Sequence, residues 1–174
     1  MTEKDIQNKL FEILFDMQDI STGFQKFYFI TPNVTLFEGW ESDLIVKDSK
    51  ERIYEFEIKT SKDDFLADKK KKRTKILKAG NDEQRKPNFF YYILPESADI
   101  KEIEVPEFAG FYIYRAYQCN ERGLVIEFFL QREAPLLTER LTNSKEIQKL
   151  LTSIYFKFWR ERTGINTRVQ KKVY

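Results

Sequence analysis

The sequence predicts an α/β protein in which a central mixed β-sheet is flanked by helices. Three observations support this prediction. Two segments in which apolar and charged residues alternate meet around Lys50, which is typical of a β-hairpin, and a helical pattern follows them. The next segment, Asn88 to Leu94, is continuously apolar and aromatic, as expected of a strand buried on both faces. A strand, a helix and a buried strand in succession imply a right-handed crossover between parallel strands.

The N-terminal segment, residues 2–16, is predicted to form a helix because apolar residues recur in it at helical spacing. Its apolar stripe is expected to pack on the sheet. Residues 18–33 are expected to form a loop that contains a short aromatic segment, residues 27–30, either as an edge strand or as a packing loop. Proline cannot donate to a sheet ladder, so Pro32 argues against a long strand through this segment.

The hairpin centred near Lys50 carries the chemistry. With this turn, the residue numbers of each cross-strand pair sum to 100, which places Asp43 opposite Glu57. Directly opposed side chains have Cβ atoms roughly 5 Å apart, so two carboxylates there could share a divalent cation. Lys59 lies on the same face, two residues further along. Such alternation is also typical of a solvated hairpin face, so the spacing alone is weak evidence. The opposite face is apolar and is formed by Leu44, Val46, Phe56 and Ile58.

A helix is predicted to follow the hairpin, with Ser61 as its N-cap and its end near Ala79. Phe65 marks its buried edge, but basic residues interrupt the apolar stripe in its middle. That pattern suits an element that contacts phosphates, because lysine binds phosphate as a point charge without reading bases. A solvated helix face would show the same pattern.

The second half of the chain is predicted to contain a strand at residues 111–114, a hairpin partner at residues 124–130 and a turn between them that includes Cys119. A final helix is expected at residues 144–162, with Ser144 as its cap. Its aromatic residues Tyr155 and Trp159 are expected to pack rather than to stack on bases. Residues 1–163 then form one domain, and residues 164–174 form a basic tail.

Composition excludes several classes of protein. The 174 residues include one cysteine and no histidine, which excludes an intramolecular disulfide, zinc fingers, histidine-based nucleases and Ser-His triads. The apolar runs are too short to span a bilayer, so we expect a cytoplasmic protein that does not contact membranes. The formal net charge is only +2, but basic residues concentrate in residues 62–86 and 157–174. Such segregation favours phosphate-bearing partners.

Several blocks of the chain, in order, resemble the PD-(D/E)XK nuclease superfamily. They read WESDLIV, YEFEIKTSKDDFLADKKKK, KPNFFYYILPE, EVPEFAGFYIY and REAPLL, between Trp40 and Leu137. Within the superfamily, the similarity is greatest to the MmcB-like branch associated with DNA repair and to similar uncharacterised phage and bacterial proteins. The resemblance implies a restriction-endonuclease-like core.

The resemblance also implies roles for individual residues. In that superfamily, two acidic residues bind the metal, and a lysine positions or activates the attacking water. These roles fall to Asp43, Glu57 and Lys59, with the backbone carbonyl of Ile58 as an additional metal ligand. One departure is that Ser42 stands where many members carry a proline, and the superfamily tolerates this widely.

Many members carry a further acidic residue on the first helix. Glu12 is the first candidate for this position and Glu3 is the second. Glu41 is an alternative, because it lies on the Asp43 face of its strand. A glutamate on a helix surface is more often solvated than bound to a metal, so Glu12 also fits an exposed position.

The resemblance implies a Mg²⁺- or Mn²⁺-dependent nuclease that hydrolyses DNA phosphodiester bonds in repair, recombination or the processing of phage and mobile-element DNA. A non-catalytic DNA-binding or repair-accessory module of the same fold is the alternative. RNA as the partner and a homodimer as the assembly both stay open. The residues expected to contact nucleic acid are Ser61, Lys62, Lys69, Lys70, Lys72, Arg73 and Lys75.

Overall fold

The computed structural model describes residues 1–16, 27–37, 40–68, 72–78, 85–98 and 104–164. A six-stranded mixed sheet has its strands in sequence order. Its strands are β1 (Phe27–Val34), β2 (Ser42–Asp48), β3 (Ile53–Ile58), β4 (Phe89–Pro95), β5 (Gly110–Cys119) and β6 (Gly123–Arg132). The helices are α1 (Glu3–Asp16), α2 (Lys62–Asp68), α3 (Lys72–Lys78) and α4 (Ser144–Thr163), with a 3₁₀ turn, η1 (Glu96–Ala98). Within these ranges, no helix combines the length and the apolar character needed to cross a membrane.

The β2–β3 hairpin has the register that the sequence predicts. Leu44 pairs with Phe56 and Lys47 pairs with Ile53, so the residue numbers of each pair sum to 100. A slip by one residue would have moved every side chain to the other face of the sheet. The alternation of side chains therefore separates an apolar face from a face that carries charged groups.

Strand β1 is longer than expected, and the argument from Pro32 was wrong. The strand continues through Pro32, which lies opposite Leu44, to Val34. Because β1 is an edge strand, a proline costs no ladder hydrogen bond where its nitrogen faces away from the sheet.

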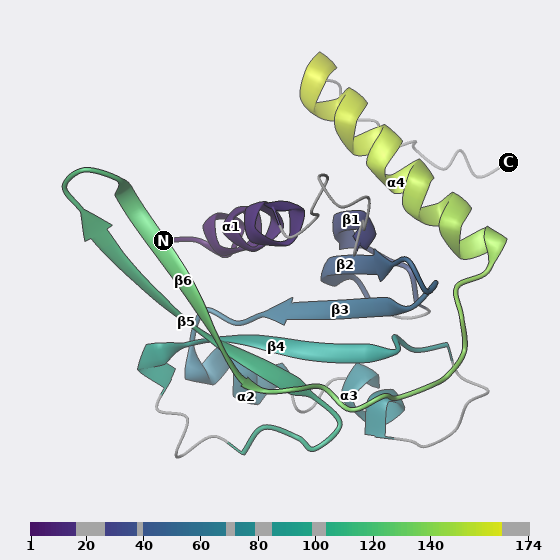
Figure 1. Ribbon diagram of the computed structural model, residues 1–174, viewed down its shortest axis with the longest axis horizontal. Helices are drawn as coiled ribbons and strands as arrows, with labels where there is room; N and C mark the ends of the chain where they lie inside the picture. Colours follow the sequence, from purple (N-terminus) through teal and green to yellow (C-terminus); the bar gives the residue numbers. More distant parts are fainter. Residues whose placement is uncertain (17–26, 38–39, 69–71, 79–84, 99–103, 165–174) are drawn as a thin grey trace, which may run out of the picture.

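The centre of the sheet is β4, which is parallel to both β3 and β5. Its residues alternate between two apolar clusters on opposite faces, as predicted for a strand buried on both sides. Tyr91 and Ile93 pack with Ile6 and Leu10 of α1 on one face, whereas Tyr92 packs with residues of α2 and α3 on the other. Figure 1 shows this layering, with α1 on one side of the sheet and α2 and α3 on the opposite side.

The predicted long helix after the hairpin is described as two short helices, α2 and α3, on either side of residues 69–71, which lie outside the described ranges. The predicted cap is confirmed, because the Ser61 hydroxyl accepts a hydrogen bond from the main-chain N–H of Asp64 at 3.1 Å. Phe65 of α2 and Leu77 of α3 are buried against the sheet, so each helix contributes one apolar anchor.

The β5–β6 hairpin is confirmed, but both strands are longer than predicted. Cys119 pairs with Gly123 and therefore ends a strand instead of lying within the turn. Gly123 adopts a positive φ of 70°, a conformation that glycine reaches without steric cost, and this permits the tight connection. In Figure 1 the end of this hairpin projects beyond the other strands.

Helix α4 differs from its prediction in its N-cap and in the exposure of its aromatic residues. Its N-cap is Asn143 rather than Ser144, because Asn143 and Glu146 form a reciprocal capping box. Leu150 is fully buried, whereas Tyr155 and Trp159, which were expected to pack, are 59% and 41% exposed. Figure 1 shows the reason, since α4 runs outward from the β1 edge and extends past the sheet.

A single buried side chain, Asn88, links the strand ends to the segment before α4. Its carbonyl oxygen accepts a hydrogen bond from the main-chain N–H of Ile53 at 2.7 Å. Its amide donates to the main-chain oxygens of Thr138 and Arg140, at 2.7 and 2.8 Å. Asn88 therefore satisfies three main-chain groups that neither the sheet nor a helix could satisfy.

Asn88→Ala is expected to lower the free energy of unfolding by about 2–4 kcal/mol, because it leaves buried main-chain groups without partners. Urea denaturation followed by circular dichroism measures the change. Gln118→Ala, at an exposed position of β5, serves as the control and should stay within about 0.5 kcal/mol of the parent. Equal stabilities of the two variants would contradict the role assigned to Asn88.

Candidate functional site

The ends of β2 and β3 bring together the three residues that the sequence singled out. Glu57 and Lys59 are both buried, at 3% exposure, and the Lys59 ammonium lies 2.8 Å from a carboxylate oxygen of Glu57. Asp43 accepts a hydrogen bond from the main-chain N–H of Ile58 at 2.7 Å, which fixes its carboxyl group beside the end of β3. Glu57 and Lys59 are therefore in direct contact, and Asp43 lies near enough for both of their charges to act on it.

The carboxyl group of Asp43 is a weaker acid than that of an ordinary aspartate. Burial and, after it, the negative charge of Glu57 together raise its pKa to about 7, against the lowering effect of the Ile58 hydrogen bond. The charge of Glu3 adds to the increase. A buried carboxyl group whose charged form is disfavoured by a neighbouring carboxylate is typical of a site that accepts a cation or a proton.

Lys59 is held by three carboxylates. Besides Glu57, its ammonium lies 3.4 Å from Asp68 and 3.7 Å from Asp64, both on α2. Burial by itself would lower the pKa of the ammonium, but the neighbouring carboxylates outweigh that effect and raise it above the ordinary value of 10.5. Lys59 is consequently a cation at every physiological pH.

Three further residues support the site and were not assigned to it from the sequence. Asp68 is fully buried and also accepts a hydrogen bond from the Tyr92 hydroxyl at 2.9 Å. Asp64 and Asp68 are four residues apart, so they share one face of α2, and that spacing was the available signal. Gln7 of α1 donates to the main-chain oxygen of Asp43 at 2.5 Å, and its position on an apolar helix stripe gave no such signal.

The donor set fits a hard divalent cation in its chemistry. Asp43 and Glu57 offer carboxylate oxygens, and the two main-chain groups of a strand residue point to the same neighbour, so we expect the Ile58 carbonyl to face β2 as well. Mg²⁺ is commonly held by one or two carboxylates together with water and substrate phosphates. In the described part of the chain, no group of three or more acidic, cysteine or histidine side chains is placed to hold a metal.

The three candidates for a further acidic ligand lie in different surroundings. Glu12 is exposed and forms an ion pair with Lys9 at 2.9 Å, so its carboxylate is engaged on the surface of α1. Glu41 is exposed, and its charge acts on Lys157 of α4. Glu3, the second candidate on the helix, is the one whose charge reaches Asp43.

The structure describes some of the residues expected to contact nucleic acid, and others lie outside the described part of the chain. Ser61 caps α2, Lys62 is partly exposed in its first turn, and Lys75 is exposed on α3. Lys69 and Lys70 lie outside the described residues. Lys72 and Arg73 belong to α3, but their side chains are not among those described.

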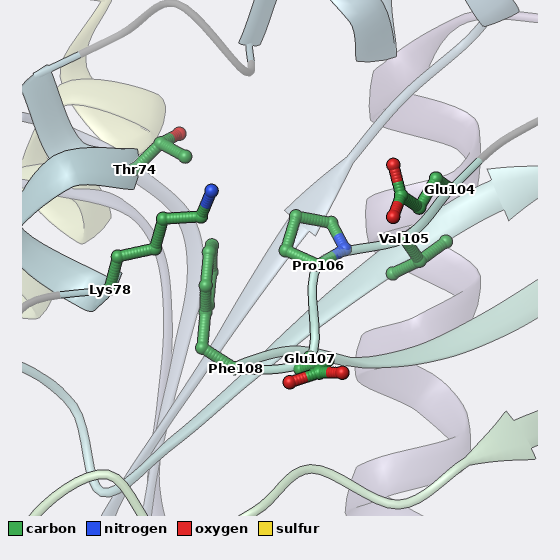
Figure 2. A pocket seen from close by; sticks show the side chains of 7 residues that line it. All are labelled: Thr74, Lys78, Glu104, Val105, Pro106, Glu107 and Phe108. Atoms are coloured by element: carbon green, nitrogen blue, oxygen red, sulfur yellow. The ribbon is translucent and has the colours of Figure 1, made fainter.

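A cavity of about 460 Å³ lies between α3 and the segment that precedes β5. Figure 2 shows Thr74 and Lys78 of α3 on one side and Pro106 and Phe108 on the other. The lining shares no residue with the Asp43 site and includes two glutamates, Glu104 and Glu107. Their charges would repel phosphate, so we do not assign the hydrolytic chemistry to this cavity.

Comparisons with known proteins bear on the fold only. No protein-family model matches the chain, and no curated protein matches it. A solved structure, the SPO1766 protein of unknown function from Silicibacter pomeroyi, is similar with a TM-score of 0.57 and 17% sequence identity. The match covers 84% of this chain and 86% of that one. The arrangement of helices around the sheet therefore recurs in another protein.

The raised pKa of Asp43 makes the stability of the metal-free protein depend on pH. The neutral carboxyl contributes stability fully below the ordinary pKa of 3.8, and this contribution is lost as the pH rises to about 7. Asp43→Asn, whose amide oxygen can still accept the Ile58 hydrogen bond, should therefore raise the unfolding temperature by roughly 5 °C more at pH 8 than at pH 5.

Thermal unfolding in the presence of a chelator measures this difference. Asp63→Asn, at an exposed position of α2, is the control and should show no such pH dependence. If Asp43→Asn changes the unfolding temperature equally at both pH values, the pKa of the Asp43 carboxyl is not raised.

Proposed function

We propose that this chain is a metal-dependent nuclease with a restriction-endonuclease-like core that hydrolyses phosphodiester bonds in DNA. The observation that carries the proposal is a buried, permanently cationic lysine beside two carboxylates at the ends of one antiparallel strand pair. The sequence resemblance supports the same assignment and favours a role in DNA repair, recombination or the processing of mobile DNA. The single-layer sheet with helices on both faces is compatible with it.

Asp43, Glu57 and the Ile58 carbonyl would hold Mg²⁺ or Mn²⁺. When bound, such an ion offsets charge on the phosphate and lowers the pKa of a coordinated water. Because the raised pKa of Lys59 keeps it protonated, it cannot act as a general base. Its role is instead to donate hydrogen bonds to the attacking water or to the phosphate oxygens that gain negative charge.

The α2 carboxylates act through Lys59. Asp64 and Asp68 hold the ammonium from the side opposite the sheet, and Asp68 is itself fixed by Tyr92. Positioned groups of this kind limit the reorganisation needed when charge develops in a transition state. We therefore regard both aspartates as positioning residues.

A DNA-binding or repair-accessory module without turnover is the second candidate. Two observations favour it. The described residues include no group of three or more acidic side chains placed to hold a metal, and Lys59 is already paired with Glu57. The basic segment that begins with α2 would then be the functional part of the protein, with DNA or RNA as the partner.

Cleavage assays with single-residue variants separate the two candidates. Glu57→Gln should abolish cleavage of DNA in Mg²⁺ or Mn²⁺, because it removes one of two carboxylate donors. Lys59→Gln retains a hydrogen-bond donor but no charge, and should lower kcat by roughly 10²-fold or more while metal binding persists. Calorimetric titration of Mn²⁺ into each protein, without DNA, measures metal binding.

The matched control is Lys47→Gln. Lys47 is equally buried on the neighbouring strand and pairs with Glu51 at 2.7 Å, so its loss disturbs the fold in a similar way without touching the site. Removing one partner of a buried ion pair is destabilising, so circular dichroism must show that each variant is folded. A parent protein that cuts no DNA would leave the accessory function in its place. Lys59→Gln that cuts as fast as Lys47→Gln would contradict the role assigned to Lys59.

The salt dependence of DNA binding tests the basic segment. Each phosphate contact should contribute about −0.9 to the slope of log affinity against log salt concentration. A triple variant that combines Lys70→Ala, Lys72→Ala and Arg73→Ala should flatten this slope. Fluorescence anisotropy in the presence of a chelator measures it. A control with the same loss of charge, Lys4→Ala, Lys50→Ala and Arg122→Ala, should change it less. Equal slopes for the two variants would mean that the basic segment is only a solvated face.

A further inference from the structure

The outward face of α4 is an exposed aromatic surface. Its large apolar side chains are 41–59% exposed, and four of the five are aromatic. The rings contact one another edge to face, for example Tyr155 and Trp159 with centroids 6.2 Å apart. The members of this aromatic face are Leu151, Tyr155, Phe156, Phe158 and Trp159.

The rest of the structure holds the aromatic face outward. On the inner side of α4, Leu150 is buried in an apolar cluster with Ile45 and Ile53. Lys149 donates to the main-chain oxygen of Leu36 at 3.3 Å, and Lys157 donates to that of Asn33 at 2.9 Å. The helix cannot rotate to bury its rings without breaking these contacts. Exposed apolar surface of this kind marks a binding face.

The charge of α4 favours a polyanion over a second copy of the helix as the binding partner of the aromatic face. Helix α4 carries five lysine or arginine residues and two glutamates, and one of these glutamates, Glu146, is buried in the cap and paired with Arg140. A second copy of α4 would therefore bring like charges together. A polyanion would find positive charge instead, from Arg160 and Arg162 among others.

The aromatic character points to bases rather than to a protein helix. Helix pairing relies on branched aliphatic side chains that fit between those of the partner, whereas flat rings suit stacking. We propose that the aromatic face of α4 binds single-stranded DNA, with its rings stacked on bases and its basic residues on the phosphates. The choice of DNA rests on the proposed nuclease function.

The helix that carries the aromatic face is connected, through its inner side, to the candidate site. The main-chain oxygen of Asn33 accepts from Lys157 of α4, and its side-chain oxygen accepts from Gln7 at 2.9 Å. Gln7 in turn donates to the main-chain oxygen of Asp43. Helix α4 is thus joined, through its inner side, to the segment that carries Asp43. The substrate class that follows is DNA with a single-stranded segment, such as an overhang, a flap or a gap.

Tryptophan fluorescence reports directly on the aromatic face, because Trp40 and Trp159 are the two tryptophans of the chain. The full chain is titrated with an oligothymidylate, and with a duplex of equal length, in a chelator that prevents cleavage. Stacking should quench the fluorescence on binding of the oligothymidylate. Trp159→Phe should lose this quenching and keep its affinity, and Trp159→Ala should bind roughly 10-fold more weakly or worse. Affinity is measured by anisotropy of a labelled strand.

Phe129→Ala, which removes an aromatic ring of similar exposure from β6, is the control and should bind as the parent does. Equal affinity of Trp159→Ala and the parent for the oligothymidylate would overturn the proposal. So would a parent dimer in sedimentation velocity that Trp159→Ala dissociates, because the face would then join two copies. Quenching through Trp159 in a parent that cuts no DNA in Mn²⁺ would support the surface and contradict only the nuclease function.

Discussion

The site depends on the buried ammonium group of Lys59, which requires carboxylate partners. A lysine at 3% exposure is tolerated only where carboxylates surround it, because an unpaired charge in the interior costs several kcal/mol. Lys59 satisfies this need from two elements, through Glu57 on β3 and through Asp64 and Asp68 on α2. The same contacts hold α2 against the end of β3 and keep Lys59 charged.

Asp43 and Glu57 interact differently, because the charge of Glu57 disfavours the charged form of Asp43. The sheet forces this proximity, because the hairpin register places them at corresponding positions and the Ile58 N–H holds the Asp43 carboxyl in place. Functional sites commonly retain an electrostatic cost of this kind when binding of a ligand relieves it. A divalent cation would relieve it here, and protonation of Asp43 near neutral pH relieves it without one.

The sequence predicts those features that depend on local periodicity. Alternation with a period of two residues was sufficient for the hairpin register, and a continuous apolar run was sufficient for β4. Features that depend on neighbours were missed. Pro32 is tolerated because β1 is at an edge, and Asp68 faces inward because Lys59 lies beneath it. The apolar pattern of α4 predicts an apolar face, but only the structure shows that Trp159 is 41% exposed.

The most direct test is an anomalous difference map from crystals of the parent protein soaked in Mn²⁺. If Asp43 and Glu57 form a metal site, the map will show a Mn²⁺ ion in contact with both carboxylates and with the carbonyl of Ile58. Crystals of Glu57→Gln, treated in the same way, will lack this peak. A parent map without a peak between these residues, or with Mn²⁺ bound only elsewhere, would contradict the metal-dependent mechanism.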